Sequence, residues 1–198
     1  WNDAMAAKVQ LLIDQAKAAG AESISLIPRN DAPVYASDEA RLAALREALA
    51  AIKPMLEKAD MIGLVEPLGF LSSSLRSKQE AVDAIKAVGA EGRFKLVHDT
   101  FHHHLAGGGP IFPEHTGIVH ISGVVDPALK PEEMQDGHRI LVDASDRLGN
   151  IEQIRALLDA GYDGTFSYEP FSPEVHALAD PEQAHRQSMQ FIRSAITA

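Results

Sequence analysis

The sequence contains no cysteine, which excludes a disulfide scaffold, a cysteine-based zinc module and thiol catalysis. It has no apolar run long enough to span a membrane, and its N-terminus does not resemble a secretion signal, so we expect a cytoplasmic protein. Positive charge is also scarce, with 18 Lys and Arg against 28 Asp and Glu in 198 residues. A net charge of −10 disfavours binding to nucleic acid, whose phosphates must be neutralised by basic side chains.

Helical and strand-like patterns alternate along the chain. Apolar residues at a 3.6-residue period predict helices at 3–19, 38–58, 77–88, 150–160 and 181–196. Short apolar runs predict strands at 24–27, 61–65, 94–97, 118–121 and 165–168. We expect Asn150 to cap its helix and residues 107–110 to form a flexible loop. No linker interrupts residues 1–198, so the alternation predicts one α/β domain with a parallel sheet.

Ionisable residues recur at or near the carboxyl ends of four successive predicted strands. They are Glu66, Asp99, His120 and Glu169. The carboxyl ends of parallel strands meet at one edge of a sheet, where three crowded carboxylates would repel one another without a cation. Three oxygen ligands and one nitrogen suit Mn²⁺, Mg²⁺, Co²⁺ or Zn²⁺. Each residue alone could equally cap a helix or lie in a solvated loop, but the joint pattern favours a divalent metal site.

A run of three histidines follows the second of these candidates. In an extended segment, His102 and His104 would share one face and His103 would occupy the other. We therefore assign a functional role to His102, a supporting role to His104 and none to His103, with a solvated loop as the alternative. Arg139 is a further candidate because it lies between the third and fourth predicted ligands, although a lone arginine is most often a surface ion-pair partner.

Four segments, residues 63–67, 97–107, 118–121 and 160–171, are together similar to the inosose (2-keto-myo-inositol) isomerases, which belong to the xylose-isomerase-like TIM barrels. The resemblance covers essentially the whole chain. It implies that the metal ligands are Glu66, Asp99, His120 and Glu169. It also implies that His102 contacts the substrate and that Arg139 lies in the pocket.

The resemblance also implies a (β/α)8 barrel, of which this chain holds about the last five βα units. We expect the N-terminal units to be missing. A second departure is that residues 143–150 replace the Gly-x-Gly turn that usually follows the pocket arginine in the family. This difference leaves the substrate open.

The function implied is a divalent-metal-dependent isomerase or epimerase acting on a sugar or cyclic polyol ketone, as in inositol catabolism. Glu66 and Glu169 would act as acid and base in a proton transfer through an enediolate. An inosose dehydratase begins with the same proton abstraction and stays open, as does a non-catalytic binding domain with a vestigial site. An apurinic endonuclease of the same barrel family is disfavoured by the charge of −10. The sequence leaves open whether the chain forms a homo-oligomer.

Overall fold

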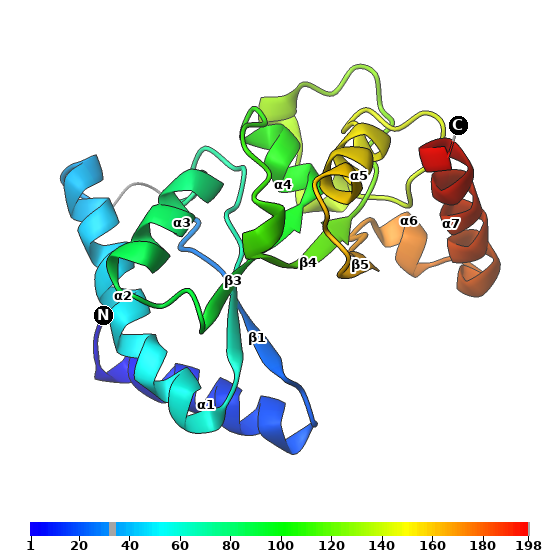
Figure 1. Ribbon diagram of the computed structural model, residues 1–198. Helices are drawn as coiled ribbons and strands as arrows, with labels where there is room; N and C mark the ends of the chain where they lie inside the picture. Colours follow the sequence, from blue (N-terminus) through cyan, green and yellow to red (C-terminus); the bar gives the residue numbers. More distant parts are fainter. Residues whose placement is uncertain (32–34, 198) are drawn as a thin grey trace. The chain divides into compact units, whose positions relative to one another are not determined.

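The computed structural model describes residues 1–31 and 35–197 (Figure 1). The chain forms two compact units. The first comprises Trp1–Leu68 and Ser72–Val97, and the second comprises Gly69–Leu71 and His98–Ala198. Among the described residues, no helix has the length and apolar character needed to cross a membrane.

The first unit alternates helices and strands as the sequence predicts. Its elements are α1 (Asp3–Ala18), β1 (Ser23–Leu26), α2 (Asp38–Ala59), β2 (Ile62–Val65), α3 (Lys78–Ala87) and the greater part of β3 (Phe94–Asp99). β1 pairs in parallel with β2, and β2 pairs in parallel with β3. Gly63 lets β2 lie close to its neighbours, because a Cβ there would come within 2.8 Å of the Phe94 ring.

Arg41 joins α2 to α3 within the first unit. Its Nη2 donates to Oε1 of Glu80 at 2.8 Å, and its Nη1 donates to Oε2 of Glu80 at 3.0 Å and to the carbonyl of Ser74 at 2.9 Å. This two-pronged geometry matches the planar guanidinium to the carboxylate. The pair therefore fixes the start of α3 against α2.

The second unit continues the alternation (green to red in Figure 1). Its elements are α4 (Thr100–Leu105), β4 (Thr116–Ile121), α5 (Asn150–Asp159), β5 (Thr165–Tyr168), α6 (Pro173–His176) and α7 (Pro181–Thr197), with 3-10 turns at Pro113–His115, Pro131–Glu133 and Asp136–His138. β4 pairs in parallel with β5, and the strand order β1-β2-β3-β4-β5 follows the chain. This order is the one that successive βα units give, and it confirms the predicted fold class.

The two-residue period of β4 and β5 decides which side chains face the predicted site. Val119 and Ile121 belong to an apolar cluster with residues of α5 and α7, and Phe166 and Tyr168 of β5 pack against the same cluster. Because side chains alternate along a strand, His120 faces the opposite side of the sheet. Glu169 follows β5 in the same alternation, and its N–H donates to the carbonyl of Ile121 at 2.9 Å.

Two local predictions are wrong. Residues 102–104 are not extended but helical, because Asp99 caps α4 by accepting a 2.9 Å hydrogen bond from the N–H of His102. Successive helical residues point in three directions, so the expected pairing of His102 with His104 on one face is lost. Asn150 is the first residue of α5 and not its cap, which is Gly149 in the left-handed conformation.

Candidate metal centre

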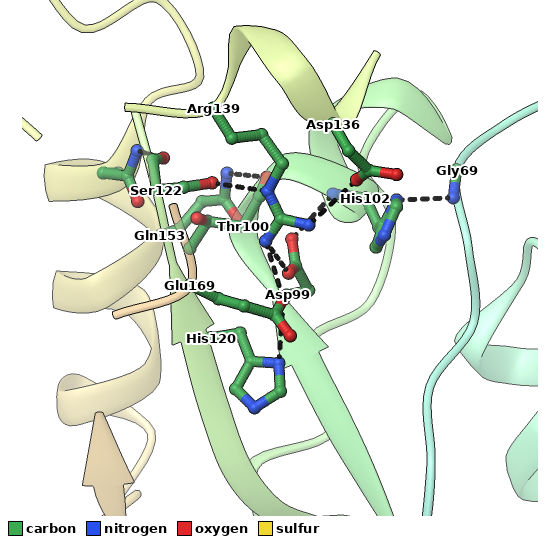
Figure 2. A network of polar contacts seen from close by, with 11 residues as sticks. Gly69, Asp99, Thr100, His102, His120, Ser122, Asp136, Arg139, Gln153 and Glu169 are labelled. Carbon is green, nitrogen blue, oxygen red and sulfur yellow. Dashed lines mark hydrogen bonds and ion pairs between the residues drawn. The ribbon is translucent and has the colours of Figure 1, made fainter. Parts of the chain in front are cut away.

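Three of the predicted ligands converge within the second unit. Asp99, His120 and Glu169 each offer a ligand atom, and these atoms lie within 4.8 Å of one another. Figure 2 shows the three side chains directed toward a common point from the ends of β3, β4 and β5. Asp99 is buried, whereas His120 and Glu169 are half-buried.

Glu66, the fourth predicted ligand, belongs to the first unit. It directly follows β2, and its N–H continues the strand pairing by donating to the carbonyl of Leu26 at 3.2 Å. The side chain is 3% exposed, unusually little for a glutamate. Its participation in the centre stays a prediction.

Figure 2 shows the guanidinium of Arg139 beside the carboxylates of Asp99 and Glu169. Its Nη2 donates to Oδ2 of Asp99 at 2.6 Å and to Oε2 of Glu169 at 2.8 Å. Nη1 donates to Oδ1 of Asp136 at 3.2 Å, and Nε donates to the hydroxyl of Ser122 at 3.0 Å. The side chain is 1% exposed, so Arg139 is not a surface ion-pair partner, and its role as a pocket residue stays a prediction.

Backbone pairing holds Arg139 in this place. The next residue, Ile140, forms an isolated antiparallel bridge with Gly123, with N–H···O distances of 2.7 and 2.8 Å. A Cβ at Gly123 would lie 3.0 Å from the carbonyl of Leu141, so glycine permits this close approach. The carbonyl of Arg139 also accepts hydrogen bonds from the N–H groups of Phe171 and Ser172, just beyond β5.

The charges around Glu169 keep it ionised. Burial by itself would raise the pKa of this carboxyl, but the hydrogen bond and charge of His120 and the charge of Arg139 outweigh it and lower the pKa to about 2. Nδ1 of His120 lies 3.2 Å from Oε2 of Glu169. Burial opposes the charge of Arg139 as well, yet Asp99 and Glu169 hold its pKa above the ordinary value. The guanidinium therefore stays charged at any physiological pH.

His102, the predicted substrate contact, is 4% exposed. Its Nδ1 accepts a 3.2 Å hydrogen bond from the N–H of Gly69, so the neutral ring carries its hydrogen on Nε2. The ring packs edge-on against Phe70 and Phe101, with centroids 5.1 and 5.2 Å away. A Cβ at Gly69 would come within 2.4 Å of the His102 carbonyl, which shows how tightly this segment seats the imidazole.

Two residues that the sequence did not identify stabilise the residues of the metal centre through hydrogen bonds. Ser122 receives the Nε hydrogen of Arg139, as described above. Gln153 of α5 donates to the carbonyls of Thr100 and Leu148, and its Oε1 lies 2.9 Å from Nε2 of the buried His98. This contact braces the end of β3 immediately beside Asp99. An uncharged glutamine on an amphipathic helix gives no sequence signal for such a role.

The donor set fits a hard or borderline divalent cation. Two carboxylates and one imidazole provide oxygen and nitrogen ligands without sulfur, and they approach from three different strands. Three protein ligands leave coordination positions for a fourth residue, water or substrate, as catalytic metal sites require. Asp99, His120 and Glu169 would hold the ion.

Comparison with known proteins agrees with this architecture. The family described as Xylose isomerase-like TIM barrel matches residues 2–195. A xylose isomerase domain containing protein from Salmonella typhimurium LT2 is 30% identical, with a TM-score of 0.85 over 100% of this chain and 71% of that one. No curated protein sequence matches this chain.

More distant solved structures share the fold. An IolI protein with a bound zinc atom is 17% identical, with a TM-score of 0.81 over 96% of this chain and 68% of that one. The D-psicose 3-epimerase of Clostridium cellulolyticum H10, solved with D-tagatose, is also 17% identical, with a TM-score of 0.69 over 96% of this chain and 70% of that one. The strand order, the strand-end cluster and the match over nearly every residue together show that this chain belongs to the xylose isomerase-like TIM barrel family.

Proposed function

We propose that this chain acts as a divalent-metal-dependent isomerase or epimerase on a sugar or cyclic polyol ketone of the inosose type. The observation that carries the proposal is the convergence of Asp99, His120 and Glu169 within 4.8 Å at the carboxyl ends of their strands. In barrels of parallel strands, catalytic groups gather at this edge. The names of the similar structures support the class, because they include a D-psicose 3-epimerase and a zinc-binding IolI protein.

The proposed chemistry is a proton transfer beside a carbonyl group. A bound divalent ion would supply Lewis-acid polarisation of that carbonyl. Glu169 is the proposed base, which takes the proton from the neighbouring carbon and leaves an enediolate. Glu66 is the second carboxylate of the proposal, and it returns a proton to the substrate. Because hydrogen moves only as a proton, no nicotinamide or flavin is required.

Two residues are proposed to orient the substrate. His102, whose Nδ1 accepts from the N–H of Gly69, is proposed to contact a substrate hydroxyl or carbonyl oxygen. Arg139 has five N–H groups, of which the contacts to Asp99, Glu169, Asp136 and Ser122 use four. The remaining N–H on Nη1 is the one that we assign to a substrate oxygen.

The test is exchange of substrate hydrogen with solvent. The chain, loaded with Mn²⁺, is incubated in D₂O with an inosose or with D-tagatose, and proton NMR follows the C–H signal next to the carbonyl. We expect deuterium to enter at that carbon, and we expect Glu169→Gln to abolish the exchange while its circular dichroism stays native. Glu174→Gln, an exposed glutamate of the same unit, is the matched control. Wild-type exchange in Glu169→Gln would exclude Glu169 as the base, and a product lacking one water would indicate a dehydratase.

A further inference from the structure

The Arg139 guanidinium and the proposed divalent ion would bind the same two carboxylates, those of Asp99 and Glu169. Arg139 donates to Oδ2 of Asp99 and to Oε2 of Glu169 through a single nitrogen, Nη2. Both residues are also ligands in the proposed metal centre, on which this inference rests. We infer that Arg139 is a positioning residue that holds these two carboxylates together and competes with the divalent ion for them, so that it sets how tightly the chain binds metal.

Both oxygens of Asp99 and one oxygen of Glu169 already accept from protein donors. Oδ1 of Asp99 accepts the 2.9 Å hydrogen bond from the N–H of His102 that caps α4, and Oδ2 faces Arg139. Oε2 of Glu169 is shared between Arg139 and His120. A divalent ion that binds Asp99 must therefore share an oxygen with an existing donor or displace that donor, and at Oε2 of Glu169 it meets the same competition. Displacement or sharing weakens the contacts of Arg139.

Several contacts fix the position of the guanidinium, so moving it away from the two carboxylates would cost free energy. Its Nε is tied to Ser122, and the rings of Phe101 and Phe171 flank it, each with its centroid 5.0 Å from Cζ. Stacking on aromatic faces and a planar set of donors are properties of arginine that lysine lacks. With 1% of the residue exposed, the positive charge is poorly screened by water. A cation that stays this close to the ligands repels a second cation bound by them.

The opposing effects of Arg139 can be ranked. As a clamp, it keeps Asp99 and Glu169 in place and so favours metal binding by reducing the ordering cost. As a buried unit charge, it opposes a divalent ion through a Coulomb term that grows with the product of the charges. Because the guanidinium is buried and its charge is poorly screened, the second effect should be the larger, so removal of the charge should strengthen metal binding even though the protein itself becomes less stable.

The experiment measures Mn²⁺ affinity by isothermal titration calorimetry and the melting temperature by circular dichroism, after removal of metal with a chelator. Arg139→Met keeps the aliphatic stem and removes the guanidinium. We expect it to bind Mn²⁺ about tenfold more tightly than the wild type or better. We also expect a lower melting temperature without metal and a larger rise on adding metal. Arg139→Lys keeps the charge but loses the fork, so it should bind Mn²⁺ no more tightly than the wild type.

Arg147→Met is the matched control. Arg147 is a half-buried arginine of the same unit, and its Nη1 donates to the backbone carbonyls of Asp126 and Leu129. This variant should lower the melting temperature and leave Mn²⁺ affinity within about twofold of the wild type.

Equal or weaker Mn²⁺ binding by a folded Arg139→Met would overturn the inference alone, since the wild type would still bind metal. If Arg139→Met does not fold, Arg139→Gln, which also removes the charge, decides in its place: tighter binding supports competition, and unchanged or weaker binding contradicts it. Absence of Mn²⁺ binding by the wild type and every variant would overturn both the inference and the proposed metal dependence.

Discussion

Asp99→Asn isolates the charge of Asp99 from its role as a helix cap. Asparagine has the same size, and it is as good a cap as aspartate. It has only one carbonyl oxygen, however, which can accept from the N–H of His102 or from Arg139 but not from both. If the cap is retained, the amide NH₂ points at the guanidinium. The substitution therefore removes the 2.6 Å ion pair between two side chains that are each 1% exposed.

The magnitude follows from this burial. Loss of one partner from a buried ion pair costs about 3–5 kcal/mol when the other charge is left uncompensated. Arg139 keeps Glu169 and Asp136 as neighbours, so we expect the lower end of this range, about 3 kcal/mol. For a chain of this length that corresponds to a melting temperature lower by about 6–12 °C. Asp99→Ala also removes the cap, and we expect it to cost about 1 kcal/mol more.

The assay is urea unfolding followed by far-ultraviolet circular dichroism in the presence of a chelator. Asp143→Asn is the control, because Oδ1 of this exposed aspartate accepts a loop hydrogen bond from the N–H of Ser145, which asparagine can keep. We expect the control to change stability by less than about 0.5 kcal/mol. A free energy of unfolding for Asp99→Asn within about 1 kcal/mol of the wild type would refute the reasoning, because a buried pair of this geometry could not then be intact.

Three further predictions concern pH, packing and the first unit. The pKa of Glu169 is about 2, below its ordinary 4.5, so its contribution to stability is present above pH 4.5 and is lost as the pH falls toward 2. Glu169→Gln should reduce the loss of stability between pH 4.5 and pH 2, measured as urea midpoints without metal. An unchanged loss of stability in this range would argue against the lowered pKa. Gly69→Ala places a Cβ 2.4 Å from the His102 carbonyl and should lower the free energy of unfolding by about 1–3 kcal/mol in a urea titration. Gly92→Ala is the control, because a Cβ there meets no atom of the described residues within 4 Å, and it should leave the free energy of unfolding nearly unchanged. Arg41→Met breaks the pair with Glu80 and should cost about 1.5–3 kcal/mol by thermal unfolding, and a loss below about 0.5 kcal/mol would mean that the pair is solvated like an ordinary surface ion pair.

The sequence predicted the architecture because periodicity reports burial directly. Every predicted helix and strand is present, with ends that differ by a few residues, since fraying and capping depend on local contacts that periodicity does not register. The convergence of Asp99, His120 and Glu169 was also predictable. It follows from the rule that parallel strands end at one edge and from the alternation that turns His120 away from the α5 and α7 cluster.

The parts that were missed depend on contacts distant in sequence or on competing local signals. The segment 102–104 was interpreted as extended because its histidines were considered apart from Asp99, whose capping side chain starts α4. The sequence predicts a pocket role for Arg139 but not its hydrogen bonds to two predicted ligands, since these lie 40 and 30 positions away. Ser122 and Gln153 carry no pattern of their own, and only the fold shows what they contact.

The central claim is that the strand-end side chains of this chain hold one divalent ion. The most direct measurement is anomalous diffraction at the manganese edge from crystals of the chain equilibrated with Mn²⁺. The account predicts one peak about 2.0–2.3 Å from a carboxylate oxygen of Asp99, a carboxylate oxygen of Glu169 and a ring nitrogen of His120, with Glu66 as the fourth ligand. No peak at these residues at saturating Mn²⁺, or a single peak bound elsewhere on the molecule, would contradict it.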